Sequence, residues 1–174
     1  MKILAFGAST SSTSINRKLA NFAAHLVPDA EVTELDLRDY TLPIYSSDIE
    51  ESDGKPADAQ RFVDAIKDHD AVVVSVAEHN GSYPAAFKNL YDWASRIEPK
   101  VWSGKPMLLL ATSPGGRGGA TVMAAAAEKF PRMGADLKAT FSLPSFYDNF
   151  ADEDGISDPT LAQQLAEAVA KLSE

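Results

Sequence analysis

The chain contains no cysteine, and this absence excludes disulfide bonds, thiolate metal sites and catalysis by a thiol. It also lacks any apolar run close to the ~20 residues that a membrane-spanning helix needs. The opening residues, MKILAFG, carry no cleavage pattern of a signal peptide and begin a strand pattern at once. We therefore expect a cytoplasmic protein that does not enter a membrane.

Basic residues are scarce, with 16 Lys and Arg against 25 Asp and Glu, for a net charge of −9. This balance argues against nucleic acid and against an anionic membrane surface as partners. A length of 174 residues with 45% hydrophobic content suits one well-buried domain spanning 1–174. Two acidic, turn-rich stretches, Ser46–Pro56 and Phe150–Asp158, are predicted to be surface loops rather than domain boundaries.

Apolar runs alternate with helical patterns along the chain. The runs AVVVSVA and MLLLAT are nearly continuous, as expected for parallel strands that helices cover on both faces. The predicted strands are Lys2–Phe6, Val32–Leu37, Ala71–Val76 and Met107–Thr112, with Leu137–Phe141 as a weaker fifth. The predicted helices are Ser14–Leu26, Ala57–Asp68, Ala85–Arg96, Thr121–Phe130 and Pro159–Leu172.

This alternation predicts right-handed βαβ units in a three-layer α/β domain. Five strands and five helices fit a flavodoxin-like fold with a five-stranded parallel sheet of order 2-1-3-4-5, and half of a Rossmann fold is the alternative. In such sheets the ligand lies beyond the carboxyl ends of the strands, where the strand order reverses. The loops that follow Phe6, Val76 and Thr112 are therefore the candidates for a binding site.

The first of these loops carries six consecutive hydroxyl residues, Ser9 to Ser14, and no acidic residue. Hydroxyls next to the amino end of a helix can donate hydrogen bonds to an anion without adding charge. Ser14 or Thr13 can cap that helix, and Asn16 can reach back to the loop. The loop matches neither GxxxxGK[ST] nor GxGxxG, which favours a monophosphate over a triphosphate or a dinucleotide. The alternative is an ordinary serine-rich turn.

The other two loops suit contact with a flat ligand. The second, Ala77–Pro84, combines an imidazole, an amide and a phenol with a flexible glycine, although a lone His79 in such a loop is more often merely solvated. The third, Ser113–Gly119, has four glycines in five positions, which let the backbone approach a ligand closely or simply form a mobile turn. No GxSxG motif is present, and nothing places a hydrolytic triad.

Three segments together resemble the NAD(P)H-dependent FMN reductase family, namely GASTSSTSINRKLA, AEHNGSYPAAFKNLYDWASR and LLLATSPGGRGG. The middle segment is the most specific, because the family typically has Pro-Glu-Tyr-Asn, a turn, a proline, Leu-Lys-Asn and Asp-Trp. The residues in register are Glu78, Asn80, Pro84, Lys88, Asn89, Asp92 and Trp93. The chain departs from the family pattern at Ala8 for Gly, Ser11 for Arg, Ala77 for Pro and His79 for Tyr.

The resemblance implies an FMN site. The residues that it places around the FMN phosphate are Ser9, Ser11, Ser14, Ile15 and Asn16. Those that it places along the flavin ring are Ala77, Glu78, His79, Asn80, Gly81, Ser113, Gly115 and Gly116. Because Ser11 replaces the usual arginine, phosphate binding would depend on hydroxyls and the helix dipole.

The resemblance further implies an oxidoreductase that takes hydride from NADPH or NADH and reduces flavins, quinones or similar small acceptors by ping-pong turnover. The flavin supplies the chemistry, so neither a catalytic side chain nor a metal is expected. A homodimer or homotetramer, paired through the helix at Ala85–Arg96, is implied as well. Around the open flavin face, His79, Tyr83 and Arg117 would set specificity, with Arg117 either contacting the 2′-phosphate of NADPH or only keeping its loop soluble. The alternatives are a flavodoxin-type electron carrier and a flavin-free subunit that binds a partner.

Overall fold

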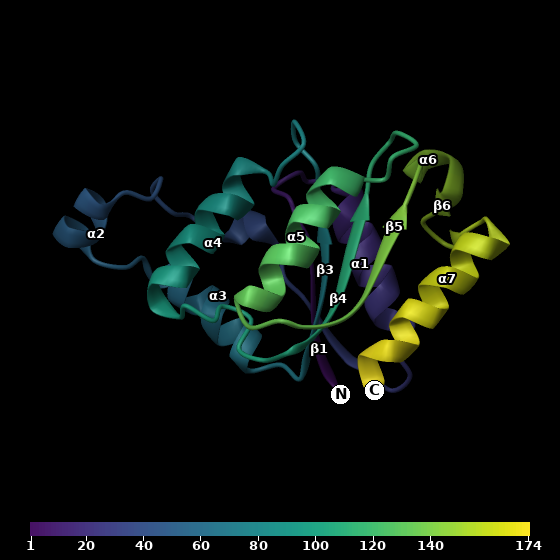
Figure 1. Cartoon of the computed structure of the whole chain (residues 1–174), viewed down its shortest axis with the longest axis horizontal. Helices are drawn as coiled ribbons and strands as arrows, with labels where there is room; N and C mark the ends of the chain where they lie inside the picture. The colour runs from purple at the N-terminus through teal and green to yellow at the C-terminus, as the bar shows by residue number, and fades with distance from the viewer.

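The computed structural model describes residues 1–174 and has a five-stranded sheet at its centre (Figure 1). All neighbouring strands are parallel, and their spatial order is β2-β1-β3-β4-β5. The strands are β1 (Lys2–Ala8), β2 (Glu31–Glu34), β3 (Ala71–Val76), β4 (Pro106–Thr112) and β5 (Asp136–Leu143). The predicted flavodoxin-like sheet is confirmed, since half of a Rossmann sheet would place its strands in the order 3-2-1.

Helices cover both faces of this sheet. One apolar cluster packs α1 (Ile15–His25) and α7 (Pro159–Ala170) against one face, where they lie side by side in Figure 1. The other cluster packs α3 (Ala57–Lys67), α4 (Ala85–Ile97) and α5 (Ala120–Arg132) against the opposite face. None of the helices combines the length and the apolarity needed to cross a bilayer.

The central strands are buried as their apolar runs predict. Every residue of β3 is buried, and so are the last six of β4, because helices cover both faces there. The edge strand β2 is shorter than the predicted Val32–Leu37 and ends at Glu34. Its continuation turns into a 3₁₀ helix at Leu37–Asp39, which Asp36 caps by accepting a hydrogen bond from the backbone N–H of Arg38.

Both stretches predicted to be loops contain secondary structure. The first holds α2 (Ser47–Asp53), capped by the Ser46 hydroxyl, which accepts a hydrogen bond from Ile49 N at 3.2 Å. This helix buries no residue and lies on an arm that projects from the body of the molecule (Figure 1). The second follows the short helix α6 (Phe146–Asn149) and contains the hairpin strands β6 (Phe150–Ala151) and β7 (Gly155–Ile156). Neither stretch has the apolar periodicity from which helices and strands are predicted.

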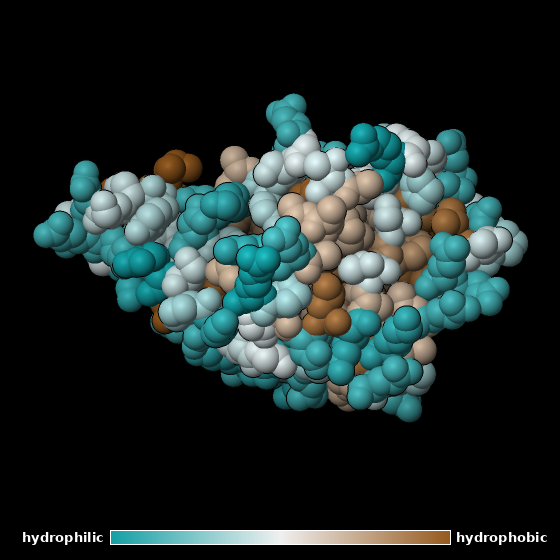
Figure 2. Space-filling view, viewed as in Figure 1, coloured by the Kyte–Doolittle hydropathy of each residue, from teal (hydrophilic) through white to brown (hydrophobic).

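The aromatic residues of α4 belong to the protein interior. Phe87 and Trp93 are fully buried and Tyr91 nearly so, which means that they are not presented for pairing with a second copy. The Trp93 indole donates a hydrogen bond to the carbonyl of Pro43 at 2.8 Å, and Asn89 Nδ2 donates to the same oxygen at 2.9 Å. These side chains tie the base of the arm to the body. In Figure 2 the arm is mainly hydrophilic, whereas the surface over α5 is weakly hydrophobic.

Candidate functional site

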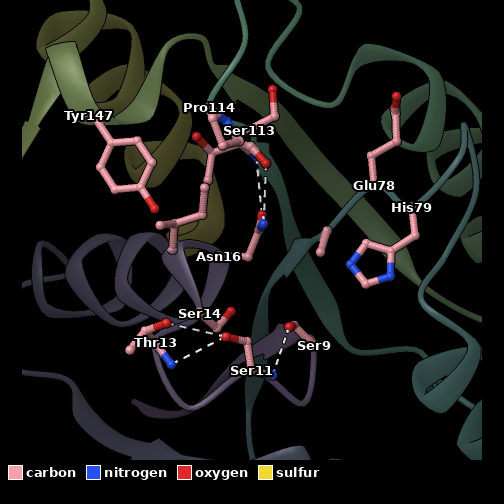
Figure 3. Close-up of a pocket in the computed structure, with 13 residues that line it drawn as sticks. Ser9, Ser11, Thr13, Ser14, Asn16, Glu78, His79, Ser113, Pro114 and Tyr147 are labelled. Atoms are coloured by element: carbon pink, nitrogen blue, oxygen red, sulfur yellow. Dashed lines mark hydrogen bonds between the residues drawn. The ribbon is translucent and has the colours of Figure 1, made fainter.

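A cavity of about 220 Å³ lies where β1, β3 and β4 end, at the predicted edge of the sheet (Figure 3). All three candidate loops and α6 contribute to its wall. The lining residues are Ser9, Ser11, Thr13, Ser14, Ile15, Asn16, Ala77, Glu78, His79, Thr112, Ser113, Pro114 and Tyr147. The site residues predicted from the sequence are among them, with four exceptions: Asn80, Gly81, Gly115 and Gly116.

The hydroxyl loop, defined as Ser9–Ser14, leads directly into α1. Ser14 rather than Thr13 caps the helix, since its Oγ accepts a hydrogen bond from Arg17 N at 3.1 Å. The backbone N–H groups of Ile15 and Asn16 have no acceptor within the protein. These two donors, together with the positive end of the helix dipole, favour an anion at this side of the cavity.

The serine side chains of the hydroxyl loop act mainly as acceptors within the loop. Ser9 Oγ accepts a hydrogen bond from Ser11 N at 3.1 Å, and Ser11 Oγ accepts one from Thr13 N at 3.3 Å. Ser14 Oγ also acts as an acceptor in its capping bond. A hydroxyl that accepts from the backbone keeps its own O–H, so Ser9 and Ser14 retain protons to donate to a ligand in the cavity. The Ser11 and Thr13 hydroxyls also bond to each other at 3.4 Å, which leaves one proton of this pair for a ligand.

The guanidinium of Arg17 contacts the hydroxyl loop on the side away from the cavity. Arg17 Nη2 donates to the carbonyl oxygen of Ser12 at 2.8 Å, while its Nη1 is 2.5 Å from Asp36 Oδ2 and its Nε is 3.4 Å from Glu34. Hydrogen bonds from the Arg38 side chain, aided by the charge of Arg17, lower the pKa of Asp36 to about 2. Arg17 therefore braces the loop, and neutral donors face the cavity.

Beneath the loop lies a buried polar group, the floor network, formed by Asn16, Ser75 and Thr112. Asn16 Oδ1 accepts from Ser75 Oγ at 2.7 Å and from Thr112 N at 3.1 Å, and Asn16 Nδ2 donates to Thr112 O at 3.2 Å. Thr112 Oγ1 donates to Leu143 O at 2.7 Å. The network joins α1 to the ends of β3, β4 and β5. Asn16 does not hydrogen-bond to the hydroxyl loop as the sequence suggested, because its amide is engaged with the sheet.

The second loop contains a two-residue hairpin turn. His79 N donates to Ser82 O at 2.9 Å, and Ser82 N donates to His79 O at 3.1 Å. Between them Asn80 and Gly81 have φ values of 52° and 77°, the left-handed conformation that a type I′ turn needs and that the pair Asn-Gly favours. This turn carries both residues to its exposed tip, outside the cavity wall, while the His79 ring points into the cavity (Figure 3).

Glu78 lies in the cavity wall, but its carboxylate serves a helix. Oε2 accepts a hydrogen bond from Val122 N at 2.9 Å. Val122 is in the first turn of α5, whose own cap residue, Gly119, offers no side chain. A carboxylate at this position satisfies an unpaired donor and complements the helix dipole. Glu78 therefore connects the second loop to the helix that follows the third.

The glycine loop, Ser113–Gly119, divides into two parts. At its start Ser113 and Pro114 line the cavity, whereas the exposed Gly115 and Gly116 lie outside its wall. The Gly115 carbonyl accepts from Ser113 Oγ at 3.1 Å and from the backbone N of Ser145 at 2.9 Å. The first part of the loop is thus fixed to the chain after β5 and is not a free turn.

Gly118 lies in the buried second part and has a structural role. Its φ is 57°, and a Cβ there would lie 2.3 Å from Ser142 Oγ and 3.1 Å from the carbonyl of Leu143. Only a glycine fits this position without displacement of β5. Close packing of the chain, rather than contact with a ligand, therefore accounts for this glycine.

Two of the three predicted specificity residues lie away from the cavity. The Tyr83 ring stacks on Phe130, 6.1 Å between centroids, and burial raises the pKa of its hydroxyl to about 12. Arg117 is exposed and donates to Thr121 Oγ1 at 3.1 Å. Neither residue lines the cavity, whereas His79 does.

Sequence reasoning missed four lining residues: Thr13, Thr112, Pro114 and Tyr147. The first three adjoin predicted residues and could have been included with the loops that carry them. Tyr147 lies in α6, beyond the fifth strand, and no motif marks it. His79 makes only backbone hydrogen bonds, to Ser82, so the cavity holds no hydrolytic triad.

The comparisons with known proteins agree with one another. The family model described as NADPH-dependent FMN reductase matches residues 1–148. A quinone reductase of Pseudomonas putida is 38% identical over 108 residues, which are 61% of this chain and 56% of that protein. The Escherichia coli quinone reductase is 37% identical over 79 residues, 45% of this chain and 42% of that protein. The matched part thus spans about half the length of these relatives. The solved structure of the flavoenzyme NAD(P)H:(acceptor) oxidoreductase FerB from Paracoccus denitrificans superposes with a TM-score of 0.78 at 28% identity, covering 99% of this chain and 95% of that one.

Proposed function

Since the chain belongs to the NADPH-dependent FMN reductase family, we propose that it is an FMN-dependent oxidoreductase. It takes hydride from NAD(P)H and passes electrons to a flavin, a quinone or a similar small acceptor. The acceptor class follows the quinone reductases of Pseudomonas putida and Escherichia coli that the chain matches over part of their length. We further propose that residues 1–174 act as one FMN-binding domain.

The cavity wall carries this proposal, because it offers neutral donors suited to a single phosphate. Ser9 and Ser14 keep their hydroxyl protons free, Ser11 and Thr13 share one hydroxyl–hydroxyl bond that leaves one of the two protons free, and the N–H groups of Ile15 and Asn16 are unpaired at the helix start. A phosphate monoester fits such a set of donors, since a helix N-terminus and hydroxyls stabilise its charge together. No lysine or arginine lines the cavity, which distinguishes it from a triphosphate site.

The remainder of the wall suits the flavin ring. Ala77 and His79 from the second loop and Ser113 and Pro114 from the glycine loop would flank it. When bound, FMN supplies the redox chemistry, for which the protein provides binding, orientation and electrostatics. The side chain of Glu78 would support the ring only indirectly, because its carboxylate caps α5. Asn80, Gly81, Gly115 and Gly116 would act at the mouth of the cavity, where their backbones are exposed.

Flavin analysis of the purified protein tests this proposal directly. We expect a yellow protein whose extracted flavin runs as FMN on chromatography, and whose colour bleaches when NADPH or NADH is added without a partner enzyme. Recovery of mainly FAD would contradict the monophosphate assignment. A yellow protein that neither nucleotide bleaches would be a flavodoxin-type electron carrier, and a protein that binds no flavin would be a partner-binding subunit.

The family resemblance also suggests an oligomeric state. We propose a homodimer or homotetramer on the basis of the family resemblance. The aromatic residues of α4 are buried within one chain and do not contribute to this proposal. Sedimentation at micromolar concentration should give at least twice the chain mass of 18.7 kDa. A single species at the chain mass would contradict this. The proposed location is the cytoplasm, which supplies reduced nicotinamide, and cell fractionation tests it.

A further inference from the structure

Tyr147 is an exposed tyrosine at the edge of the cavity. Its side chain is 72% exposed, whereas the other four tyrosines of the chain are half-buried or buried. In Figure 3 it projects from α6 toward the cavity, on the side opposite to His79. A large aromatic side chain in this position exposes apolar surface that a ligand in the cavity would cover.

The backbone around Tyr147 is held to the glycine loop. Ser145 N donates to Gly115 O at 2.9 Å, and Phe146 N donates to Ser113 O at 3.0 Å. Ser145 has a φ of 45°, a left-handed conformation that is rare for serine. Such a conformation persists where surrounding contacts impose it, and it occurs preferentially at functional sites. These two hydrogen bonds and the unusual φ together fix where the next residues point.

Side chains on either side of Tyr147 anchor the segment from behind. Phe146 is buried and stacks on Phe150 with ring centroids 4.7 Å apart. Phe150 in turn contacts Phe22 of α1 edge-on at 5.4 Å, and Asp152 forms an ion pair with Lys18 of the same helix. Because Phe146 and Phe150 pack on the side of α1, Tyr147 is the aromatic residue of this segment that faces the cavity.

We propose that Tyr147 is a ligand-contacting residue whose phenol ring covers one side of the bound flavin nucleotide. This inference rests on the proposed function, because it takes FMN as the ligand. The ring would add an aromatic contact to a wall in which six of the other twelve residues are serine or threonine. The contribution comes from the ring rather than from the hydroxyl, which makes no hydrogen bond within the protein and is already solvated. FMN binding should therefore bury the ring of Tyr147.

Chemical nitration of the tyrosines measures this burial without any activity assay. Protein stripped of flavin and protein saturated with FMN are treated with tetranitromethane, and peptide mass spectrometry follows each tyrosine. In the flavin-free protein Tyr147 should react fastest. FMN should slow this reaction in proportion to the fraction of protein that carries FMN. Tyr45, which packs on Trp93 at the base of the arm, is the internal control whose rate FMN should leave unchanged.

Two outcomes separate this inference from the proposed function. The flavin that each sample retains after desalting is measured by absorbance. Retained FMN with an unchanged nitration rate at Tyr147 would overturn the inference and leave the proposed function standing. Failure to retain any flavin would overturn the proposed function itself.

A pair of variants tests the contribution of the ring. Titration by quenching of flavin fluorescence should show that Tyr147→Ala weakens FMN binding by about three- to tenfold, the range expected for loss of one aromatic contact. Tyr147→Phe, which keeps the ring, should remain within about twofold of the parent. Tyr45→Phe serves as a matched control with unchanged affinity. Equal losses in Tyr147→Phe and Tyr147→Ala would overturn the assignment to the ring.

Discussion

The floor and the rim of the cavity satisfy their polar groups in different ways. In the floor network the Asn16 amide is buried and bonded to Ser75 and Thr112, all within the protein. On the rim, by contrast, His79 and Tyr147 are exposed and their side chains make no hydrogen bond within the protein. Buried polar groups are costly to leave unpaired, whereas exposed ones are solvated. The floor should therefore control stability and the rim ligand binding.

Asn16→Ala should break the floor network and give the largest effect. It removes three hydrogen bonds and leaves Thr112 N and the Ser75 hydroxyl buried without their partner. We expect the free energy of unfolding to fall by about 2–4 kcal/mol, measured by urea denaturation of flavin-free protein. His79→Ala on the rim is the matched control and should stay within about 0.5 kcal/mol of the parent. Similar losses in both variants would contradict the division between floor and rim.

The glycine loop contains the same contrast within seven residues. Gly118→Ala places a methyl group against Ser142 Oγ and the Leu143 carbonyl at a positive φ, and should cost about 2 kcal/mol of stability. Gly116→Ala meets no atom within 4 Å and should change stability by less than about 0.5 kcal/mol. Thermal unfolding of both variants compares them directly. An unchanged thermal stability of Gly118→Ala would show that β5 can shift to make room for the methyl group.

Ser14 lies outside both groups but combines their features, because it is buried and caps a helix and also faces the cavity. Ser14→Ala removes the cap of α1 and should reduce the free energy of unfolding by about 1 kcal/mol. It also removes one donor to the phosphate and should weaken FMN binding about fivefold. Ser12 does not line the cavity and is therefore the control, so Ser12→Ala should leave the affinity unchanged. An unaltered FMN affinity in Ser14→Ala would mean that the hydroxyl loop is only a turn.

Arg117 lies beyond the rim and should give the smallest effect. If NADPH is preferred over NADH, Arg117→Ala should reduce that preference by about fivefold or less, as expected for one exposed charge contact. Stability and quinone turnover after flavin reduction should not change. Arg117→Lys keeps the charge and loses the planar guanidinium, so it should recover only part of the preference. Steady-state kinetics with both nucleotides measure this, and an equal loss with each would exclude a 2′-phosphate role.

The central strands were predicted well from the sequence, because strands buried on both faces appear in it as unbroken apolar runs. β3 matches the predicted Ala71–Val76, and β4 begins one residue before the predicted Met107. The edge strand β2 was less predictable, since Leu35 enters the core from the residue after the strand and Leu37 from a 3₁₀ helix. Apolar pattern indicates burial, and it does not by itself distinguish the backbone conformation that achieves it.

The site was predictable where one loop acts alone, and less so where loops contact each other. The hydroxyl loop shows its role in consecutive residues. Asn80 and Gly81 stay predicted ligand neighbours, but their turn carries them outside the cavity wall, which the sequence analysis did not anticipate. Tyr147 could not be found, because its position depends on hydrogen bonds from the backbone of Ser145 and Phe146 to Gly115 and Ser113, at least 30 residues earlier in the chain. The arm at α2 was missed for a similar reason, since Asn89 and Trp93 hold it.

The hydrogen bond from Val122 N to Glu78 affects how this chain can be engineered and how its segments can evolve. It makes the second loop and the start of α5 interdependent, although 44 positions separate the two residues. A loop grafted from a relative at 77–84 would keep α5 capped only if it brought a carboxylate to the same place. Chimeras that exchange this loop together with the segment 113–122 should therefore fold more reliably than those that exchange either one. In evolution the two segments would be expected to vary as a single module.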